Sequence, residues 1–255
     1  MKSIDLNCDM GEMPDAIADG TQESLMAYLT SVSIACGAHA GDEATMRTTI
    51  VQAMRRKLAI GAHPGYADRA NFGRLELDLS ADEIAESVFE QVTKLGEIAA
   101  KCGARLGHVK AHGALYNQAA RDAAVAEAFA DGVARWRRDV VLVGLSGSVM
   151  LEAFRRAGFS VAAEAFADRR YERNGSLRSR KFADALILNP ADAAAQAAHI
   201  AQSGRIATSD GSEIRVEAET ICVHGDTPGA VKIAAAVGER LKNAGIELRP
   251  LAAAS

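Results

Sequence analysis

Basic and titratable side chains alternate along one short stretch of the sequence, GHVKAHGALYN (Gly107–Asn117). On a β-strand, alternate side chains point to the same face, so His108, Lys110 and His112 would lie together. A buried ammonium group is costly unless a carboxylate lies nearby. The stretch therefore predicts a polar face that meets acidic groups, where acid–base chemistry and stabilisation of an oxyanion are both available.

The same alternation occurs in three other short apolar runs. Two further runs end in a histidine or are followed by one. The side chains concerned are Asp5, Asn7 and Asp9; Glu164 and Asp168; His224 and Asp226; and the single residues His39 and His63. Charges scattered over a surface would not fall on one strand face in four separate segments. Of the histidines, only His199 lies within a helical pattern. The pattern as a whole predicts one shared polar centre.

Short apolar runs alternate with longer helical patterns along the chain. We expect strands at Ser3–Cys8, Val32–Cys36, Leu58–Ala62, Gly107–His112, Val140–Leu145, Ser160–Phe166 and Thr220–His224, and helices at Glu43–Lys57, Ala81–Cys102, Ala120–Arg135, Val149–Ala157, Ala191–Gln202 and Pro228–Asn243. Such alternation implies a parallel sheet with right-handed crossovers. Seven units without a nucleotide-binding glycine fingerprint favour a TIM-like β/α barrel. We expect one α/β domain over residues 1–255, with Asp210-Gly211 marking a hairpin insertion near 205–217.

Capping residues support several of these helices. Ser80 with Glu83 fits a capping box, and Asp42 can cap the helix that follows it. Thr227 and Pro228 fit an N-cap followed by proline in the first turn. Glycines follow four expected helix ends, where a left-handed residue is favoured, at Gly103, Gly158, Gly204 and Gly245.

A parallel barrel gives the polar residues one place to meet, the mouth formed by the carboxyl ends of the strands and the loops after them. The loops after His63 and Asp168 are long for a compact domain and carry several arginines. Arg74 and Arg169 can each hold a carboxylate or phosphoryl group through two parallel hydrogen bonds, although arginines are also common in solvated loops. Asp226 equally fits a helix cap.

Composition narrows the class of protein. The chain has 255 residues, of which 49% are hydrophobic, and its net charge of −4 argues against nucleic-acid binding. No apolar run is long enough to span a membrane, and the N-terminus lacks the features of a signal peptide. The cysteines, Cys8, Cys36, Cys102 and Cys222, show no C-x-x-C spacing. These features predict a reduced cytoplasmic protein.

Seven motifs, in order across nearly the whole chain, resemble the LamB/YcsF family. They are DLNCDMGE (Asp5–Glu12), IACGAHAGD (Ile34–Asp42), GAHPGYAD (Gly61–Asp68), FGR (Phe72–Arg74), VKAHGALYN (Val109–Asn117), EAFADRRY (Glu164–Tyr171) and ICVHGDTP (Ile221–Pro228). The resemblance implies a seven-stranded β/α barrel akin to glycoside hydrolases and polysaccharide deacetylases. It also implies 5-oxoprolinase activity, the ATP-dependent opening of 5-oxo-L-proline to L-glutamate, with subunits B and C as partners. The family usually has asparagine where this chain has Ser33.

The candidate site residues come from these motifs. As catalytic residues we expect Asp9, His63, Lys110, His112, Glu164 and His224, and as substrate-binding residues Asp5, Asn7, Glu12, His39, Arg74, Tyr116, Asn117, Asp168, Arg169 and Asp226. The chain has no G-x-x-x-x-G-K-[ST] loop. ATP, with a divalent ion such as Mg²⁺, is therefore expected mainly on the partner subunits or in a non-standard site.

Two other classes of function fit the same residues. A metal-dependent amide or ester hydrolase of the deacetylase type would hold a divalent ion with Asp9, His39 and His63. A non-catalytic subunit that binds a small ligand would need the same polar mouth. Elemental analysis of the purified protein tests for the metal that the first class requires. Alanine at Lys110 or His112 distinguishes an enzyme from a binding subunit, because only an enzyme can lose turnover while it keeps binding its ligand.

Overall fold

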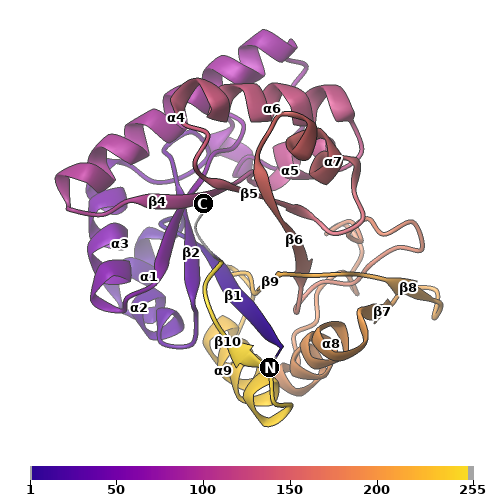
Figure 1. Ribbon diagram of the computed structural model, residues 1–255. Coiled ribbons are helices and arrows are strands. Elements are labelled where there is room, and N and C mark those ends of the chain that lie inside the picture. Colours follow the sequence, from indigo (N-terminus) through magenta and orange to yellow (C-terminus); the bar gives the residue numbers. More distant parts are fainter. Residues whose placement is uncertain (1, 252–255) are drawn as a thin grey trace.

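Seven parallel strands close into a barrel in the computed structural model, which describes residues 2–251 (Figure 1). The barrel strands are β1 (Ser3–Met10), β2 (Ser31–Ala35), β3 (Ala59–His63), β4 (Leu106–Lys110), β5 (Val141–Leu145), β6 (Ser160–Phe166) and β9 (Thr220–Cys222). Each strand pairs in parallel with the next, and β9 pairs back with β1. β10 (Glu247–Leu248) extends the sheet along the start of β1. The expectation of a seven-stranded TIM-like barrel is confirmed.

Helices cover the outside of the barrel (Figure 1). They are α1 (Pro14–Ala18), α2 (Thr21–Met26), α3 (Glu43–Arg55), α4 (Ala81–Lys101), α5 (Gly113–Ala119), α6 (Ala123–Trp136), α7 (Val149–Arg156), α8 (Pro190–Ser203) and α9 (Ala230–Asn243), with a short 3₁₀ turn at Arg69–Asn71. The capping box of Ser80 and Glu83 is present at the start of α4, and the Asp42 carboxylate accepts a hydrogen bond at the start of α3. Both sequence predictions are confirmed.

Three local expectations were wrong. The helix expected over Ala120–Arg135 is α6, but it begins later, at Ala123, because the Asp122 carboxylate accepts hydrogen bonds from its first turn. The short helix α5 before it was not expected. The short helices α1 and α2 were not expected. Thr227 does not cap the last helix, which begins at Ala230 after Gly229 at φ +79°. Its hydroxyl donates instead to the Asp168 carboxylate at 2.7 Å.

Strand side chains divide between an apolar outer layer and a largely polar interior. On β1, Leu6 and Cys8 are buried in the main apolar core. The alternate residue Asp5 lies inside the barrel, where its carboxylate accepts hydrogen bonds from the hydroxyls of Thr30, Ser31 and Thr220. Because Asp5 precedes Asp9 by four strand residues, it lies roughly 13 Å closer to the amino ends of the strands.

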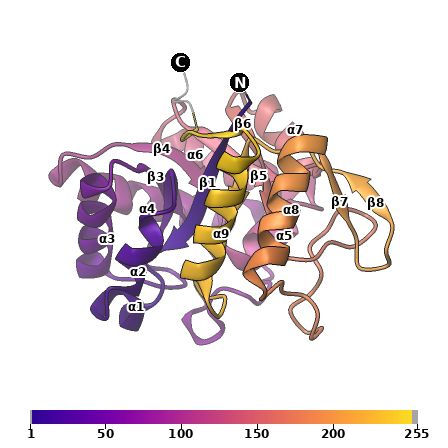
Figure 2. The same cartoon turned by 90° about the horizontal axis from the view of Figure 1, so that it is seen from below.

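The two ends of the barrel differ in their loops. In Figure 2 the long loops after β3 and β6 gather at the end of the barrel opposite the start of β1 and β10. The short strands β7 (Arg205–Ala207) and β8 (Glu213–Arg215) pair antiparallel and form a hairpin at the side of the barrel beyond α8. Among the described residues, no helix has the length and apolar character needed to cross a membrane.

Candidate active site

A cavity of about 1110 Å³ lies at the carboxyl ends of the strands. Its lining includes all the residues expected to be catalytic, which are Asp9, His63, Lys110, His112, Glu164 and His224. Of the residues expected to bind substrate, it includes Glu12, Arg74, Tyr116, Asn117, Arg169 and Asp226. The other four expected substrate contacts, Asp5, Asn7, His39 and Asp168, lie behind or beneath this lining. The structure therefore gives them supporting positions and not direct ones.

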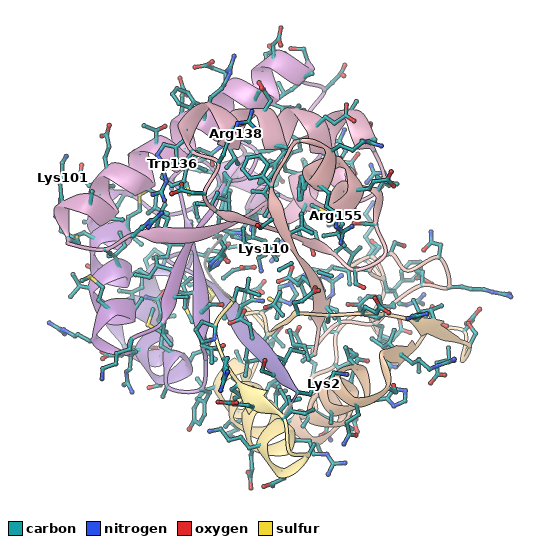
Figure 3. All side chains as sticks on the ribbon, in the orientation of Figure 1. Lys2, Lys101, Lys110, Trp136, Arg138 and Arg155 are labelled. Atoms are coloured by element: carbon teal, nitrogen blue, oxygen red, sulfur yellow. The ribbon has the colours of Figure 1, made fainter. Side chains whose placement is uncertain are left out.

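Lys110 lies at the centre of the barrel and is only 2% exposed (Figure 3). Its Nζ atom is 2.7 Å from Asp9 Oδ1 and 3.0 Å from Glu164 Oε1, and it donates to Asn7 Oδ1 at 3.1 Å. Burial alone would lower the pKa of Lys110, but the neighbouring carboxylates of Asp9 and Glu164 hold that pKa well above its ordinary value. The ammonium group therefore stays protonated and is fixed at the floor of the cavity.

Glu164 is held from three directions and is fully buried. Besides Lys110, it accepts hydrogen bonds from the hydroxyl of Tyr116 at 2.8 Å and from the amide of Asn7 at 3.0 Å. Cys222 lies beside this group, with its sulfur 3.5 Å from Lys110 Nζ. Burial raises the pKa of the Cys222 thiol well above its ordinary value, so this cysteine packs as a small neutral side chain.

His224 and Asp168 form a hydrogen-bonded pair beside the cavity. The ring atom Nδ1 of His224 lies 2.9 Å from Asp168 Oδ1, while Asp168 Oδ2 accepts from the backbone N–H of His224 and from Thr227. Burial alone would raise the pKa of Asp168, but the charge and hydrogen bonds of His224 hold that pKa below its ordinary value. The ionised carboxylate fixes the proton on Nδ1 and leaves Nε2 as the basic nitrogen, as a general base requires.

Three histidines gather on the other side of Asp9. The ring of His39 stacks on that of His112 at 3.7 Å, and the ring of His63 meets both edge-on. Glu12 joins them, with Oε1 3.0 Å from His39 Nε2 and 3.0 Å from His112 Nδ1. Burial lowers the pKa of His39 to about 4, so this ring is neutral at neutral pH.

The metal-ligand set expected from the sequence, Asp9 with His39 and His63, is not the set that the structure brings together. Glu12, His63 and His112 present ligand atoms within 4.8 Å of one another. His39 lies behind them and directs Nε2 at Glu12. The structure therefore groups the same types of side chain, histidines with a carboxylate, in another combination.

The arginines of the mouth differ in whether they are already paired with a carboxylate. Arg74 and Arg180 both pair with Asp226, so Asp226 anchors two loops and does not cap a helix. Arg169 is 6% exposed, and it donates to the backbone carbonyl of Arg178 at 2.7 Å. Its Nε atom has no hydrogen-bond partner among the described residues. Burial and the charge of Arg180 lower the pKa of Arg169 to about 10, so it remains a cation.

Sequence reasoning missed some contributors to the site. Phe72 supplies a backbone carbonyl that accepts from His112 Nε2 at 2.8 Å, and no side-chain pattern signals such a role. Arg180 was visible in the arginine-rich loop after β6 but was not selected, because only the fold shows its pairing with Asp226. Ser33 lies inside the barrel with Oγ 3.3 Å from His108 Nε2 and does not line the cavity.

Fold and site together define a β/α-barrel protein with a polar, acid–base centre at the carboxyl ends of its strands. The chain belongs to the LamB/YcsF family, whose model matches residues 4–255. It is 47% identical to a protein of Chloroflexus aggregans that is named as the A subunit of 5-oxoprolinase, over 98% of this chain and 99% of that one. The protein of the same name from Shouchella clausii is 43% identical over 98% of both chains.

Solved structures agree with this assignment. The lactam utilization protein from Thermus thermophilus superposes with a TM-score of 0.90 at 38% identity, over 98% of this chain and 100% of that one. The peptidoglycan deacetylase PdaC from Bacillus subtilis matches with a TM-score of 0.50 at 14% identity, over 98% of this chain and 88% of that one. The second likeness concerns the fold alone.

Proposed function

We propose that this chain is the subunit of a 5-oxoprolinase that opens the ring of 5-oxo-L-proline to give L-glutamate in a reaction coupled to ATP hydrolysis. The names of relatives that align with this chain over nearly their full length support the proposal. The observation that carries it is the His224–Asp168 pair, because it places an oriented base at the cavity that also contains Lys110. Such a pair suits the addition of water to an activated amide.

Arg169 is proposed to bind the α-carboxylate of the substrate. A buried guanidinium with an unpartnered N–H favours an anionic ligand that can accept from it. Arg74 was the other arginine expected for this role, but it is already paired with Asp226. We therefore assign the carboxylate to Arg169.

In the proposed route, the lactam oxygen attacks the γ-phosphorus of ATP and ADP leaves. Ring carbon C5 of the phosphorylated lactam is then electrophilic enough for water to add. His224 takes the proton from this water, and Lys110 stabilises the negative charge on the reacting oxygens. The ring C–N bond then breaks, and the nitrogen takes a proton from the imidazolium of His224. A second water hydrolyses the resulting acyl phosphate to L-glutamate and phosphate.

ATP, with Mg²⁺, is proposed to bind mainly on partner subunits B and C, because this chain has no Walker-type phosphate loop. The distribution of exposed apolar side chains supports a covering partner. Of the seven large apolar side chains that are exposed in the described chain, five follow the carboxyl ends of barrel strands, namely Met13, Leu75, Val149, Phe182 and Leu188. Exposed apolar side chains in the segments at this end of the barrel suit contact with another protein, so we propose that the partners cover the mouth.

Reconstitution tests the proposal. Glutamate and phosphate release are measured with this chain alone, with subunits B and C alone, and with all three, and only the full mixture is expected to be active. Full activity of this chain alone would contradict the proposed division of labour.

His224→Gln in the full mixture is expected to lower kcat by about 10²–10⁴-fold while calorimetry still detects 5-oxoproline binding. His199→Gln is the matched control, because His199 is an exposed histidine of α8 that pairs with Glu213. A subunit that only binds ligand would instead keep kcat and lose affinity. Equal activity of the two variants would remove His224 from the mechanism.

A further inference from the structure

Two histidine rings in the cavity present unprotonated nitrogens to the same point. His63 Nδ1 lies 2.9 Å from the backbone carbonyl of Lys110, and His112 Nε2 lies 2.8 Å from that of Phe72. Because a carbonyl oxygen only accepts hydrogen bonds, these two nitrogens carry the ring protons. In the neutral rings, His63 Nε2 and His112 Nδ1 are therefore both acceptors, yet they lie 3.0 Å apart.

Two carboxylates point at the same place. Glu12 Oε1 lies 3.0 Å from His112 Nδ1 and 3.7 Å from His63 Nε2, and Asp9 Oδ2 lies 3.2 Å from His63 Nε2. Four acceptor atoms thus converge in a buried place, an arrangement that favours a cation among them.

The spacing of these atoms suits a first-row metal ion. The circle through Glu12 Oε1, His63 Nε2 and His112 Nδ1 has a radius of about 1.9 Å, from their three separations. Ions of the zinc type bind imidazole nitrogen and carboxylate oxygen at about 2.0–2.2 Å. An ion at that distance from all three atoms therefore fits just off their plane, with Asp9 Oδ2 close enough to serve as a further ligand.

The surroundings orient each of these groups. Metal-binding histidines commonly donate their second ring N–H to a backbone carbonyl, as His63 and His112 do here. The His39 ring stacks on that of His112, and its Nε2 atom lies 3.0 Å from Glu12 Oε1. It can donate to the carboxylate and hold it in place.

We propose that Glu12, His63 and His112, with Asp9 beside them, form a binding site for one divalent transition-metal ion. Two imidazoles with carboxylates suit Zn²⁺, Mn²⁺ or Co²⁺ better than Mg²⁺ or Ca²⁺, which prefer sets of oxygen ligands. The proposed ion site does not depend on which substrate the chain binds. Its use as a Lewis acid on the lactam oxygen or on water rests on the proposed function.

A shared proton is the competing way to satisfy the same cluster. Burial opposes protonation of His112, but Glu12 raises the pKa of this ring above its ordinary value. An imidazolium at His112 can donate to Glu12 or to His63 without any metal. Direct measurement of ion binding separates the two arrangements.

The full chain is stripped with a chelator, dialysed and titrated separately with Zn²⁺, Mn²⁺ and Mg²⁺ in a calorimeter, and its ion content is then measured by elemental analysis. We expect one equivalent of Zn²⁺ or Mn²⁺ per chain and roughly 100-fold weaker binding of Mg²⁺. Co²⁺ in the site is expected to give visible absorption bands of mixed nitrogen and oxygen coordination. Failure to take up any transition-metal ion at about 1 mM favours the shared proton and overturns the proposal.

Variants locate the ion. Glu12→Gln and His63→Gln are expected to weaken Zn²⁺ binding by more than about 100-fold, and His39→Gln by about 10–100-fold, as for residues that orient a ligand. His224→Gln is the matched control, because it removes a histidine of the same cavity from outside the cluster and is expected to leave the affinity unchanged. Circular dichroism of each metal-free variant establishes that it is folded.

An equal loss of affinity in His224→Gln, or native affinity in Glu12→Gln and His63→Gln, places the ion elsewhere and overturns the assignment. The metal titrations use this chain alone, whereas the proposed function is tested by ring opening in the three-subunit mixture. Failure of one is therefore distinguishable from failure of the other.

Discussion

Replacing Lys110 with methionine is expected to destabilise the protein by about 3–5 kcal/mol at neutral pH. Methionine resembles lysine in length and fills irregular space well, so the change removes a charge with little loss of packing. The ammonium lies 2.7 Å from Asp9 and 3.0 Å from Glu164 in a place that is 2% exposed. Without it, two buried carboxylates lose their counter-charge, and removing one partner of a buried ion pair costs about 3–5 kcal/mol.

Urea unfolding, followed by circular dichroism and by the fluorescence of Trp136, measures this loss. In thermal unfolding, a chain of this length shifts by about 2–4 °C per kcal/mol, so Tm is expected to fall by about 6–20 °C. Adding Glu164→Gln to Lys110→Met removes one of the two unpaired charges. The double variant is therefore expected to regain about 1–3 kcal/mol relative to Lys110→Met alone, as coupled neighbours do.

Lys101→Met is the control, because Lys101 lies on the outer surface at the end of α4 (Figure 3). It is expected to change the free energy of unfolding by less than about 1 kcal/mol. A loss below about 1 kcal/mol for Lys110→Met, or no recovery on adding Glu164→Gln, would refute the view that this lysine neutralises the buried carboxylates.

Three further predictions concern other parts of the molecule. Asp168→Asn is expected to lower kcat by about 10²–10⁴-fold in the three-subunit mixture, because His224 loses its orienting carboxylate. The pKa of Asp168 lies below its ordinary value of 3.8 in the folded protein, so its contribution to stability is complete above that pH and is lost as the pH falls through the folded value. Urea unfolding of Asp168→Asn between pH 2 and 7 is therefore expected to show a shallower loss of stability in acid. Arg169→Leu is expected to raise KM for 5-oxoproline at least 10-fold with a smaller change in kcat. Gly132→Ala improves helix propensity by about 1 kcal/mol, but the added Cβ would clash with the backbone oxygen of Ala85, so a net loss of about 1–3 kcal/mol is expected in thermal unfolding.

Each of these predictions has an outcome that contradicts it. Native kcat in Asp168→Asn would show that His224 needs no orienting partner. If the loss of stability in acid were as steep in Asp168→Asn as in the unsubstituted protein, Asp168 would not be the group whose protonation causes it. An unchanged KM in Arg169→Leu would move the substrate carboxylate to another cation. A higher Tm in Gly132→Ala would show that α4 and α6 can move apart enough to fit the added methyl group at little cost in free energy.

Barrel strands were predictable because each carries its own signal. The expected strand Ser160–Phe166 coincides with β6, and the capping box at Ser80 marks the start of α4. The break between α5 and α6 was not predictable from helix propensity, since alanine-rich sequence favours helix on both sides of Asp122. Only the cap hydrogen bonds of that aspartate decide where the second helix begins.

The candidate site was predictable as a set of residues but not as a set of pairs. Alternation along β1 and β4 placed Asp9 and Lys110 inside the barrel, and the structure has them 2.7 Å apart. Alternation also placed Asp168 on the same side as Glu164, but it did not show that the Asp168 carboxylate pairs with His224 and lies outside the cavity lining. Alternation tells which face a side chain occupies, and it carries no information on which neighbour that side chain meets.

By itself, the sequence determined the parallel β/α architecture, the family and the end of the barrel where the polar groups collect. The architecture and the position of the polar groups follow from the local geometry of the backbone, which repeats every two residues in a strand and every 3.6 residues in a helix. The family follows from the seven motifs. Only the tertiary structure decided that Glu12 joins His63 and His112, that Asp168 serves His224, and that Arg169 keeps a free N–H. Those distances depend on the register between strands, on barrel closure and on the paths of the long loops, and these arise from packing of the whole chain.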